Sequence, residues 1–336
     1  MTAAASPHAG VRLHIVTGKG GTGKTTVAAA LALALAQQGK RVLLAEVEER
    51  QGISQTFDVP PIGHDETRIV HERGGGELYA LSVDVRESLM EYLQKFYKLG
   101  RAGTVLEKVG AVDFATTIAP GLRDVLLIGK VYEAAGRRRG GRHHDRGGPE
   151  YDAVVLDAPP TGRVVRFLNV NAEVADVARV GPIRTQADSI TRLLRSHTTA
   201  VHVVSLLEEM PVQETVDALE ELRKASLPLG AIVINQVNDP LLGSEGLAAV
   251  GARADGLSAS VTADLKSASV RTSAAMVAGL LAEAEEHVDR VALQQEQEAV
   301  LLEQGRQVYR LPLLPEGTDA GGIRVLADAL TDQGMI

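Results

Sequence analysis

The sequence has no cysteine and no tryptophan, and its 336 residues include only four phenylalanines and six tyrosines. Without cysteine, the chain can form neither disulfide bonds nor a thiolate metal site. It also has no run of 18 apolar residues, so we expect no membrane-spanning helix. The first ten residues, MTAAASPHAG, have neither a basic start nor a long apolar core, which predicts a cytoplasmic protein without a signal peptide.

Positive charge is also in short supply. Lysine and arginine total 35 residues against 43 acidic ones, which gives a formal net charge of -8. Proteins that bind nucleic acid usually present a basic face, so we expect no nucleic-acid partner. The hydrophobic content of 45% is typical of a globular protein with a sizeable core.

Short apolar segments rich in β-branched residues recur along the chain and alternate with helical patterns. We expect strands at residues 11–17, 41–47, 77–84, 153–157, 200–206, 231–235 and 308–313. Continuous apolar runs of this kind are typical of buried parallel strands. The order predicts one α/β domain over residues 1–336, with a doubly wound, mostly parallel sheet of about seven or eight strands.

Two long stretches between the expected strands have helical apolar spacing. Residues 85–136 and 239–304 are predicted helical insertions that form a helical subdomain beside the sheet; long crossovers are the alternative. Between them, residues 136–149 read GRRRGGRHHDRGGP, which predicts a mobile surface loop. His143 and His144 in that loop are weak metal candidates because two adjacent histidines in a flexible loop do not match a metal-ligand spacing.

A glycine-rich segment follows the first expected strand. Residues 18–25, GKGGTGKT, match the phosphate-binding pattern G-x-x-x-x-G-K-[ST], and an alanine- and leucine-rich helix follows. Backbone amides and the helix N-terminus would surround phosphate oxygens. We expect Lys24 to contact the β- and γ-phosphates and the Thr25 hydroxyl to bind Mg²⁺. The predicted ligand is therefore ATP or ADP with Mg²⁺, and its binding residues are Gly20, Gly21, Thr22, Gly23, Lys24, Thr25 and Thr26.

An acidic motif further along the chain also supports a nucleotide site. Asp157 ends an apolar strand in the segment AVVLDAPPTGR, where it can hold Mg²⁺ through a water molecule. Pro159, Pro160 and Gly162 then define a turn that is suited to sensing the γ-phosphate.

Three carboxylates follow the second expected strand. Glu46, Glu48 and Glu49 lie near its C-terminal end, the edge at which ligands bind in such sheets. A carboxylate there could orient the attacking water. Spacing alone does not choose among the three, and a solvated acidic loop is the alternative.

The segment KGGTGKTT, with its additional lysine, resembles the deviant P-loop of septum-positioning and plasmid-partitioning ATPases and of the nitrogenase iron protein. The segment DAPPTGRVVRFL is more specific. It resembles the D-T-A-P-T-G-H-x-x-R-x-L segment of the arsenite-pump ATPases and the tail-anchored-protein-targeting ATPases. The segments PGLRDVLL, IVINQV and LPLLPEG resemble further parts of that family, so the resemblance spans most of the chain.

The resemblance implies roles for several residues. Lys19 would be the family's signature lysine, which reaches the phosphates of a partner subunit, and Asp157 would sense Mg²⁺ and the γ-phosphate. Asn235 would donate to or accept from the adenine, with Pro315 near the ring. Because Lys19 has no evident task within its own subunit, we expect a homodimer or a heterodimer with a paralogous ATPase.

Departures from the family pattern matter as well. The family segment D-P-A-H-x-L-x-D-x-F aligns its first aspartate, which positions the attacking water, with Glu48. Glutamate is one methylene longer, and a misplacement of about 1 Å can cost on the order of 100-fold in rate. We still expect an ATPase that hydrolyses ATP, and weak or lost hydrolysis is the alternative. Arg163 also replaces a histidine, and the absence of cysteine removes both the zinc-clasp C-x-x-C and the arsenite-binding thiolates.

Three functions stay open at this point. The first is a dimeric ATP-dependent switch that binds a protein or hydrophobic client, with a groove near residues 89–99 and 122–131; plain core is the alternative for those apolar residues. The second is a catalytically weak nucleotide-binding subunit paired with an active paralogue. The third is a positioning-type ATPase that acts on membrane or DNA. The last segment, GGIRVLADALTDQGMI, has one arginine and no lysine, so membrane contact is expected to be peripheral at most.

Overall fold

The computed structural model describes residues 6–48, 51–97, 120–139, 148–170, 182–315 and 317–336. Several sequence-based predictions therefore lie outside the described residues: Glu49, His143 and His144, most of the predicted loop at 136–149, and part of the proposed groove.

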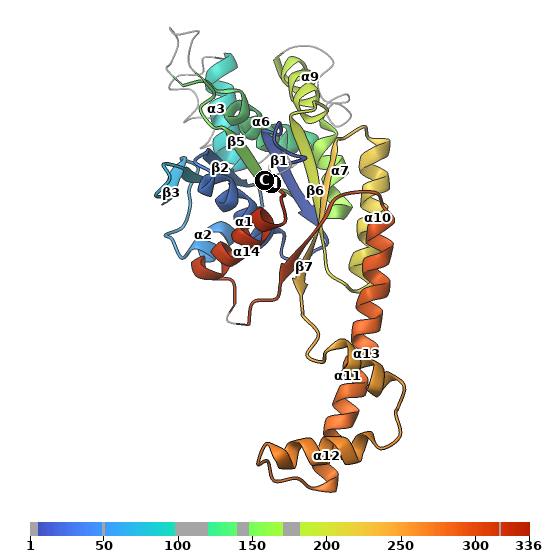
Figure 1. Cartoon of the computed structure of the whole chain (residues 1–336). Helices are drawn as coiled ribbons and strands as arrows, with labels where there is room; N and C mark the ends of the chain where they lie inside the picture. The colour runs from blue at the N-terminus through green and yellow to red at the C-terminus, as the bar shows by residue number, and fades with distance from the viewer. Residues whose placement is uncertain (1–5, 49–50, 98–119, 140–147, 171–181, 316) are drawn as a thin grey trace.

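One sheet of eight strands forms the centre of the molecule, in the order β3-β4-β2-β5-β1-β6-β7-β8 (Figure 1). All neighbouring strands are parallel except β3 and β4. The predicted doubly wound α/β fold is confirmed. The strands are β1 (Leu13–Gly18), β2 (Arg41–Glu46), β3 (Thr67–His71), β4 (Glu77–Ser82), β5 (Ala153–Asp157), β6 (Thr199–Ser205), β7 (Leu229–Val237) and β8 (Val308–Pro312).

The antiparallel strand β3 is the one element of the sheet that the sequence did not predict. It forms the edge of the sheet, and its side chains are exposed or half-buried. An edge strand that packs on little apolar surface needs no continuous apolar run, so its sequence lacks the signal that identifies the buried strands.

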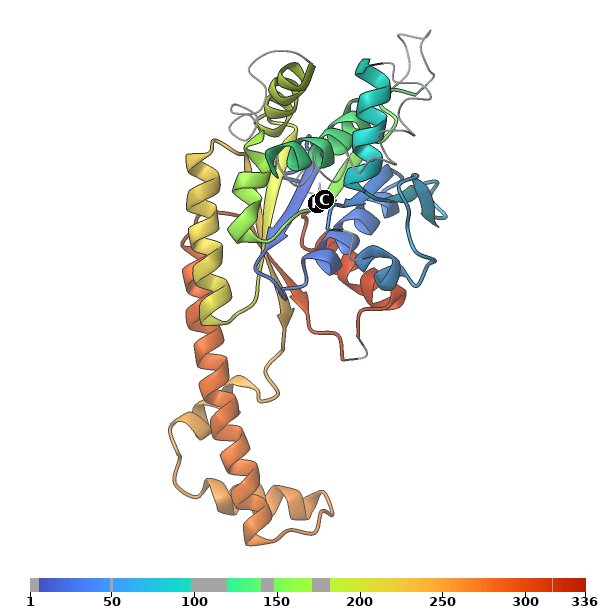
Figure 2. The same cartoon turned by 180° about the vertical axis from the view of Figure 1, so that it is seen from behind.

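Helices cover both faces of the sheet (Figures 1 and 2). One face carries α1 (Lys24–Gln37), α2 (Gly52–Phe57) and α14 (Ala320–Asp332), and the other carries α6 (Pro120–Gly136), α7 (Thr161–Leu168), α9 (Pro182–Leu194) and α10 (Glu209–Lys224). Two separate apolar clusters fill these faces. Helix α1 is buried all round because it lies between the sheet and α14, which explains its almost uninterrupted alanine and leucine sequence.

The stretch at 239–304 consists of α11 (Ser244–Gly251), α12 (Leu257–Ser267) and the 29-residue α13 (Ala274–Leu302). Helix α13 runs along α10 and extends beyond the sheet, with α11 and α12 against its far end (Figures 1 and 2). Helix α12 has no buried residue, and α13 buries only Val277, Val291 and Leu301. The division of the chain into one domain with helical insertions stays a prediction.

The other predicted insertion contains α3 (Val85–Tyr97), which packs against α6. In the described part of the proposed groove, the apolar side chains belong to the core: Leu89, Val125, Leu126, Leu127, Ile128 and Val131 are all buried. These residues therefore match the alternative interpretation, in which they are part of the hydrophobic core.

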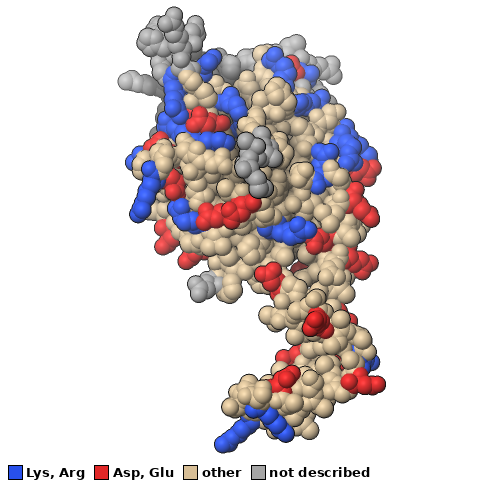
Figure 3. Space-filling view, viewed as in Figure 1, with Lys and Arg blue, Asp and Glu red and all other residues tan. Residues whose placement is uncertain are grey.

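Helix α14 packs against α1 and β8, and its apolar residues Ile323, Leu326, Ala327 and Leu330 are buried there. This explains the apolar pattern near the C-terminus without a membrane. Among the described residues, no helix has the length and apolar character needed to cross a bilayer. On the face shown in Figure 3, acidic and basic side chains are interspersed.

Candidate nucleotide site

The phosphate-binding loop joins β1 to α1 at the carboxyl end of the sheet. Gly23 lies directly before α1 with φ at 83°, a left-handed conformation that glycine adopts without strain. The Thr22 hydroxyl donates to the Lys19 carbonyl at 2.9 Å, and Lys24 Nζ lies 3.5 Å from the same oxygen. The loop thus closes on itself ahead of a helix N-terminus, a position that favours anion binding, and phosphate binding by its residues stays a prediction.

Gly18 is required by a neighbouring strand. A Cβ atom at this position would lie 2.3 Å from the carbonyl oxygen of Val204 in β6 and 2.9 Å from Thr22 Oγ1. A backbone atom cannot yield as a flexible side chain can, so a side chain at Gly18 would displace either the loop or β6.

The predicted metal-binding pair is assembled by two distant segments. Thr25 Oγ1 donates to Asp157 Oδ2 at 2.5 Å, while Asp157 Oδ1 is shielded from solvent and has no hydrogen-bond partner. A buried acceptor without a partner is costly unless a ligand satisfies it. A hydroxyl and a carboxylate are oxygen ligands of the kind that Mg²⁺ prefers, so these residues fit the predicted ion.

Burial raises the pKa of the Asp157 carboxyl to about 6, although the hydrogen bond from Thr25 and the charge of Lys24 oppose this rise. The nearby carboxylates of Glu46 and Glu48 raise it further. A bound divalent cation would favour the charged form and lower this pKa.

Lys19 has a partner in its own subunit. Its Nζ atom lies 2.9 Å from Glu214 Oε1 in α10, and Thr161 Oγ1 donates to Glu214 Oε2 at 3.3 Å. Lys19 thus has a contact within its own chain, and its expected role at the phosphates of a partner subunit stays a prediction. Glu214 belongs to none of the sequence motifs described above, so the sequence did not predict its contact with Lys19.

The three candidate carboxylates after β2 now differ. Glu46 is buried and accepts hydrogen bonds from the backbone amides of Gln51 and Ile53, at 2.9 and 3.2 Å, and from the Ser82 hydroxyl at 3.3 Å. It fixes the start of α2 and has little capacity left to orient water. Glu49 lies outside the described residues.

Glu48 lies beside a pocket of about 180 Å³ that is also lined by Arg123, Pro159, Arg163 and Phe167. Its Oε1 atom is 3.6 Å from Arg163 Nη1. The two residues that the family resemblance predicted to replace an aspartate and a histidine thus form an ion pair with each other. Sequence reasoning identified both departures but could not show that they meet.

The family profile described as anion-transporting ATPase matches residues 11–195, which is more than half of the chain. The chain belongs to this family. The match includes the phosphate-binding loop, Glu48 and Asp157, and it supports a nucleotide-binding ATPase.

Two relatives show how similarity to the anion-transporting ATPase family is distributed. ATPase BagA from Mycobacterium tuberculosis is 47% identical over 328 residues, covering 97% of this chain and 94% of the relative. The arsenical pump-driving ATPase from Acidiphilium multivorum is 28% identical over 251 residues, covering 66% of this chain and 38% of the relative. Similarity to BagA therefore includes the helices at 239–304, which the family profile does not reach.

Two residues that the family resemblance assigned to adenine lie in different settings. Asn235 is buried in β7, and its Nδ2 atom donates to the Thr22 carbonyl at 3.0 Å. A Cβ atom on Gly23 would lie 2.3 Å from this nitrogen, so Asn235 supports the phosphate-binding loop directly. Pro315 is exposed after β8. Adenine binding by either residue stays a prediction.

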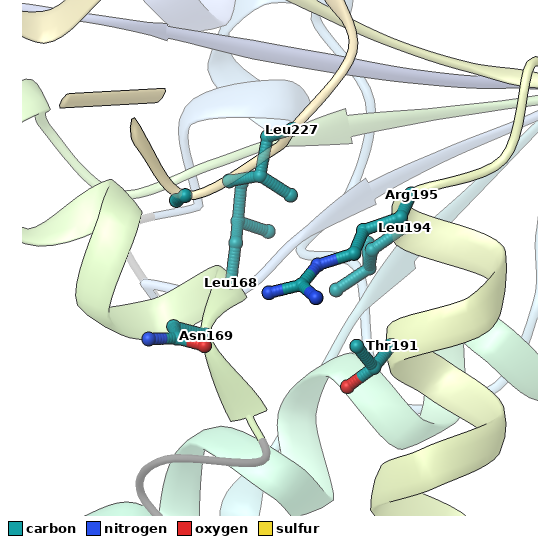
Figure 4. A pocket seen from close by; sticks show the side chains of 7 residues that line it. Leu168, Asn169, Thr191, Leu194, Arg195 and Leu227 are labelled. Atoms are coloured by element: carbon teal, nitrogen blue, oxygen red, sulfur yellow. The ribbon is translucent and has the colours of Figure 1, made fainter. Parts of the chain in front are cut away.

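A separate shallow crevice, too narrow to enclose a water molecule, lies between α7, α9 and the segment that precedes β7 (Figure 4). Arg195 extends from the end of α9 toward Leu168, and Thr191 lies one turn earlier in α9. Because Arg195 precedes β6, the crevice lies toward the amino ends of the strands, away from the phosphate-binding loop. It takes no part in the nucleotide site.

Proposed function

We propose that this chain is a Mg²⁺-dependent, ATP-hydrolysing switch whose nucleotide state controls dimerisation and client binding. The contact between Thr25 and Asp157 carries the proposal, because it leaves Asp157 Oδ1 buried without a partner beside a closed phosphate-binding loop. Mg²⁺ held there would neutralise phosphate charge. Lys24, only 8% exposed at the N-terminus of α1, would contact the β- and γ-phosphates.

The dimer part of the proposal rests on Lys19 and on its position outside the phosphate-binding helix. Its side chain is 29% exposed and is held by a single half-exposed carboxylate, so it is able to leave that partner. In the proposed active state Lys19 reaches the phosphates of a second subunit. Whether this subunit is identical or a paralogue is left to the experiment.

The client is proposed to be a protein or a hydrophobic segment. Most of the described apolar side chains of α3 and α6 are buried, and Met90 and Tyr132 are partly buried, so binding there would require these helices to move. Arg123 and Leu127 of α6 share a pocket with Glu48 and Pro159, and this contact offers a route from the nucleotide to the helix.

A second candidate function is a catalytically weak subunit that pairs with an active paralogue. The ion pair between Glu48 and Arg163 favours it, because a carboxylate held by a guanidinium is less free to orient a water molecule. In this case nucleotide binding would persist through Lys24, Thr25 and Asp157, and the contact of Thr25 with Asp157 supports this.

Steady-state ATP hydrolysis by the purified full chain separates the two candidates. A rate clearly above that of the Lys24→Ala variant supports the first, whereas equal rates with retained nucleotide binding support the second. Sedimentation equilibrium with and without Mg²⁺ and a non-hydrolysable ATP analogue tests dimerisation, and a monomer under both conditions contradicts a homodimer. Affinity capture with the analogue-bound protein then tests for a client.

A further inference from the structure

Glu214 joins two segments that are far apart in the sequence and that both belong to the nucleotide site. One oxygen contacts Lys19 in the phosphate-binding loop at 2.9 Å, and the other accepts the Thr161 hydroxyl at 3.3 Å. Thr161 is the first residue of α7 and is buried. A single carboxylate therefore links the signature lysine to the turn that follows Asp157.

That turn is held at its other end as well. Thr17 Oγ1 in β1 donates to the Pro159 carbonyl at 2.7 Å, and Asp157 accepts from Thr25. Two consecutive prolines, Pro159 and Pro160, restrict the backbone between Asp157 and Thr161. A shift of Asp157 toward a bound cation would therefore be passed to Thr161, and from there to Glu214.

The strength of the contact suits a reversible restraint. Lys19 and Glu214 have side chains 29% and 36% exposed, so water screens their attraction. The charge of a triphosphate can compete with such a pair. A fully buried pair would hold Lys19 too firmly, since its separation would leave two unpaired charges in the interior.

We infer that Glu214 is a positioning residue that holds Lys19 within its own subunit when nucleotide is absent and releases it when the Asp157–Thr161 turn moves. The inference rests on the proposed function, in which Lys19 acts on a second subunit. Release of Lys19 would then be one step of dimerisation, and Glu214 would set the nucleotide concentration at which dimers form.

The variant Glu214→Gln isolates this role. The amide oxygen of glutamine can still accept the Thr161 hydroxyl, but the residue no longer carries the charge that attracts Lys19. Glu221→Gln is the matched control, because it makes the same change at an exposed position of the same helix.

The first measurement needs no nucleotide and no dimer. The rate at which an amine-reactive acylating reagent labels Lys19, followed by mass spectrometry, is expected to rise about twofold to fivefold in Glu214→Gln, the range for loss of a half-exposed ion pair. Glu221→Gln is expected to match the unsubstituted protein. Equal labelling of Lys19 in all three proteins would overturn the inferred restraint.

The second measurement is the monomer–dimer dissociation constant with Mg²⁺ and a non-hydrolysable ATP analogue. Glu214→Gln is expected to lower it about twofold to fivefold, and the effect should vanish when Lys19→Ala is also present. An effect that persists with Lys19→Ala would contradict a role through Lys19. If the unsubstituted chain never dimerises, the proposed homodimer fails, while the labelling result still tests the restraint separately.

Discussion

Thr25 and Asp157, which lie 132 positions apart in the chain, meet through a hydrogen bond of 2.5 Å between Oγ1 and Oδ2. The parallel pairing of β1 with β5 produces this contact, since it brings the carboxyl ends of both strands to one edge of the sheet. Asp157 Oδ1 remains buried and without a partner beside it.

Asp157→Asn should therefore weaken Mg²⁺ binding in the presence of nucleotide. Asparagine keeps the shape of the side chain but lacks the charge, and we expect the Mg²⁺ concentration for half-maximal ATP binding to rise about 10- to 100-fold. A titration with a fluorescent ATP analogue measures it. Asp188→Asn, an exposed change in α9, is the control; equal Mg²⁺ dependence in Asp157→Asn and the control would contradict the proposed metal role.

Glu46 and Glu48 should differ in how much they contribute to the free energy of unfolding. Glu46→Ala removes the acceptor of two backbone amides and one hydroxyl in the core, so we expect a loss of about 1–3 kcal/mol in the free energy of unfolding. Glu48→Ala should cost about 1 kcal/mol or less, because it breaks an ion pair at the surface of a pocket. Urea unfolding measures the stability of both variants. A larger loss in Glu48→Ala than in Glu46→Ala would contradict the structural role given to Glu46.

Arg163→Ala tests whether the ion pair restrains Glu48. If Glu48 orients water, removing the guanidinium should raise kcat by at most about fivefold, because the Arg163 side chain is 61% exposed and the pair is screened. The double variant Glu48→Ala/Arg163→Ala should lose this gain. A lower kcat in Arg163→Ala would instead give the arginine a direct role at the nucleotide.

Two buried histidines should make the fold sensitive to acid. His14 Nδ1 lies 3.1 Å from His202 Nε2, and His202 Nδ1 accepts from the Ala231 amide. Burial lowers the pKa of His14 to about 3, with the charges of His8 and Lys40 lowering it further, and burial also lowers the pKa of His202. Both rings are therefore neutral in the folded protein.

The sign of the acid effect follows from proton binding. In the unfolded chain each histidine binds a proton near pH 6.5, whereas the folded state excludes it, so stability should be unaffected above this pH and decrease below it. At pH 5.5 the two rings together should cost roughly 3 kcal/mol relative to pH 7.5. Urea unfolding at both pH values measures this loss of stability. The loss should be smaller in His14→Leu than in the unsubstituted protein, whereas the exposed variant His71→Gln should lose as much as the unsubstituted protein.

Prediction from sequence succeeded where a single local pattern is sufficient. The apolar strands of the parallel sheet could be predicted because both their faces are buried. The phosphate-binding pattern could be recognised, and its position between β1 and α1 predicted, because its glycines and Lys24 lie close together in the chain. The exposed edge strand β3 escaped because burial does not constrain it. Spacing alone could not rank the candidate carboxylates Glu46, Glu48 and Glu49, because it does not show that backbone amides near the start of α2 bind Glu46.

By itself, the sequence determined the α/β class, the phosphate-binding loop and the strand-ending position of Asp157, since each depends on neighbours in the chain. Only the tertiary structure decided which distant groups these residues meet. Strand order brings Thr25 to Asp157, and the packing of α10 beside α7 brings Glu214 to Lys19 and Thr161. The physical reason is that a carboxylate forms hydrogen bonds and ion pairs only with groups a few ångströms away. Which groups lie that close depends on the folding of the whole chain.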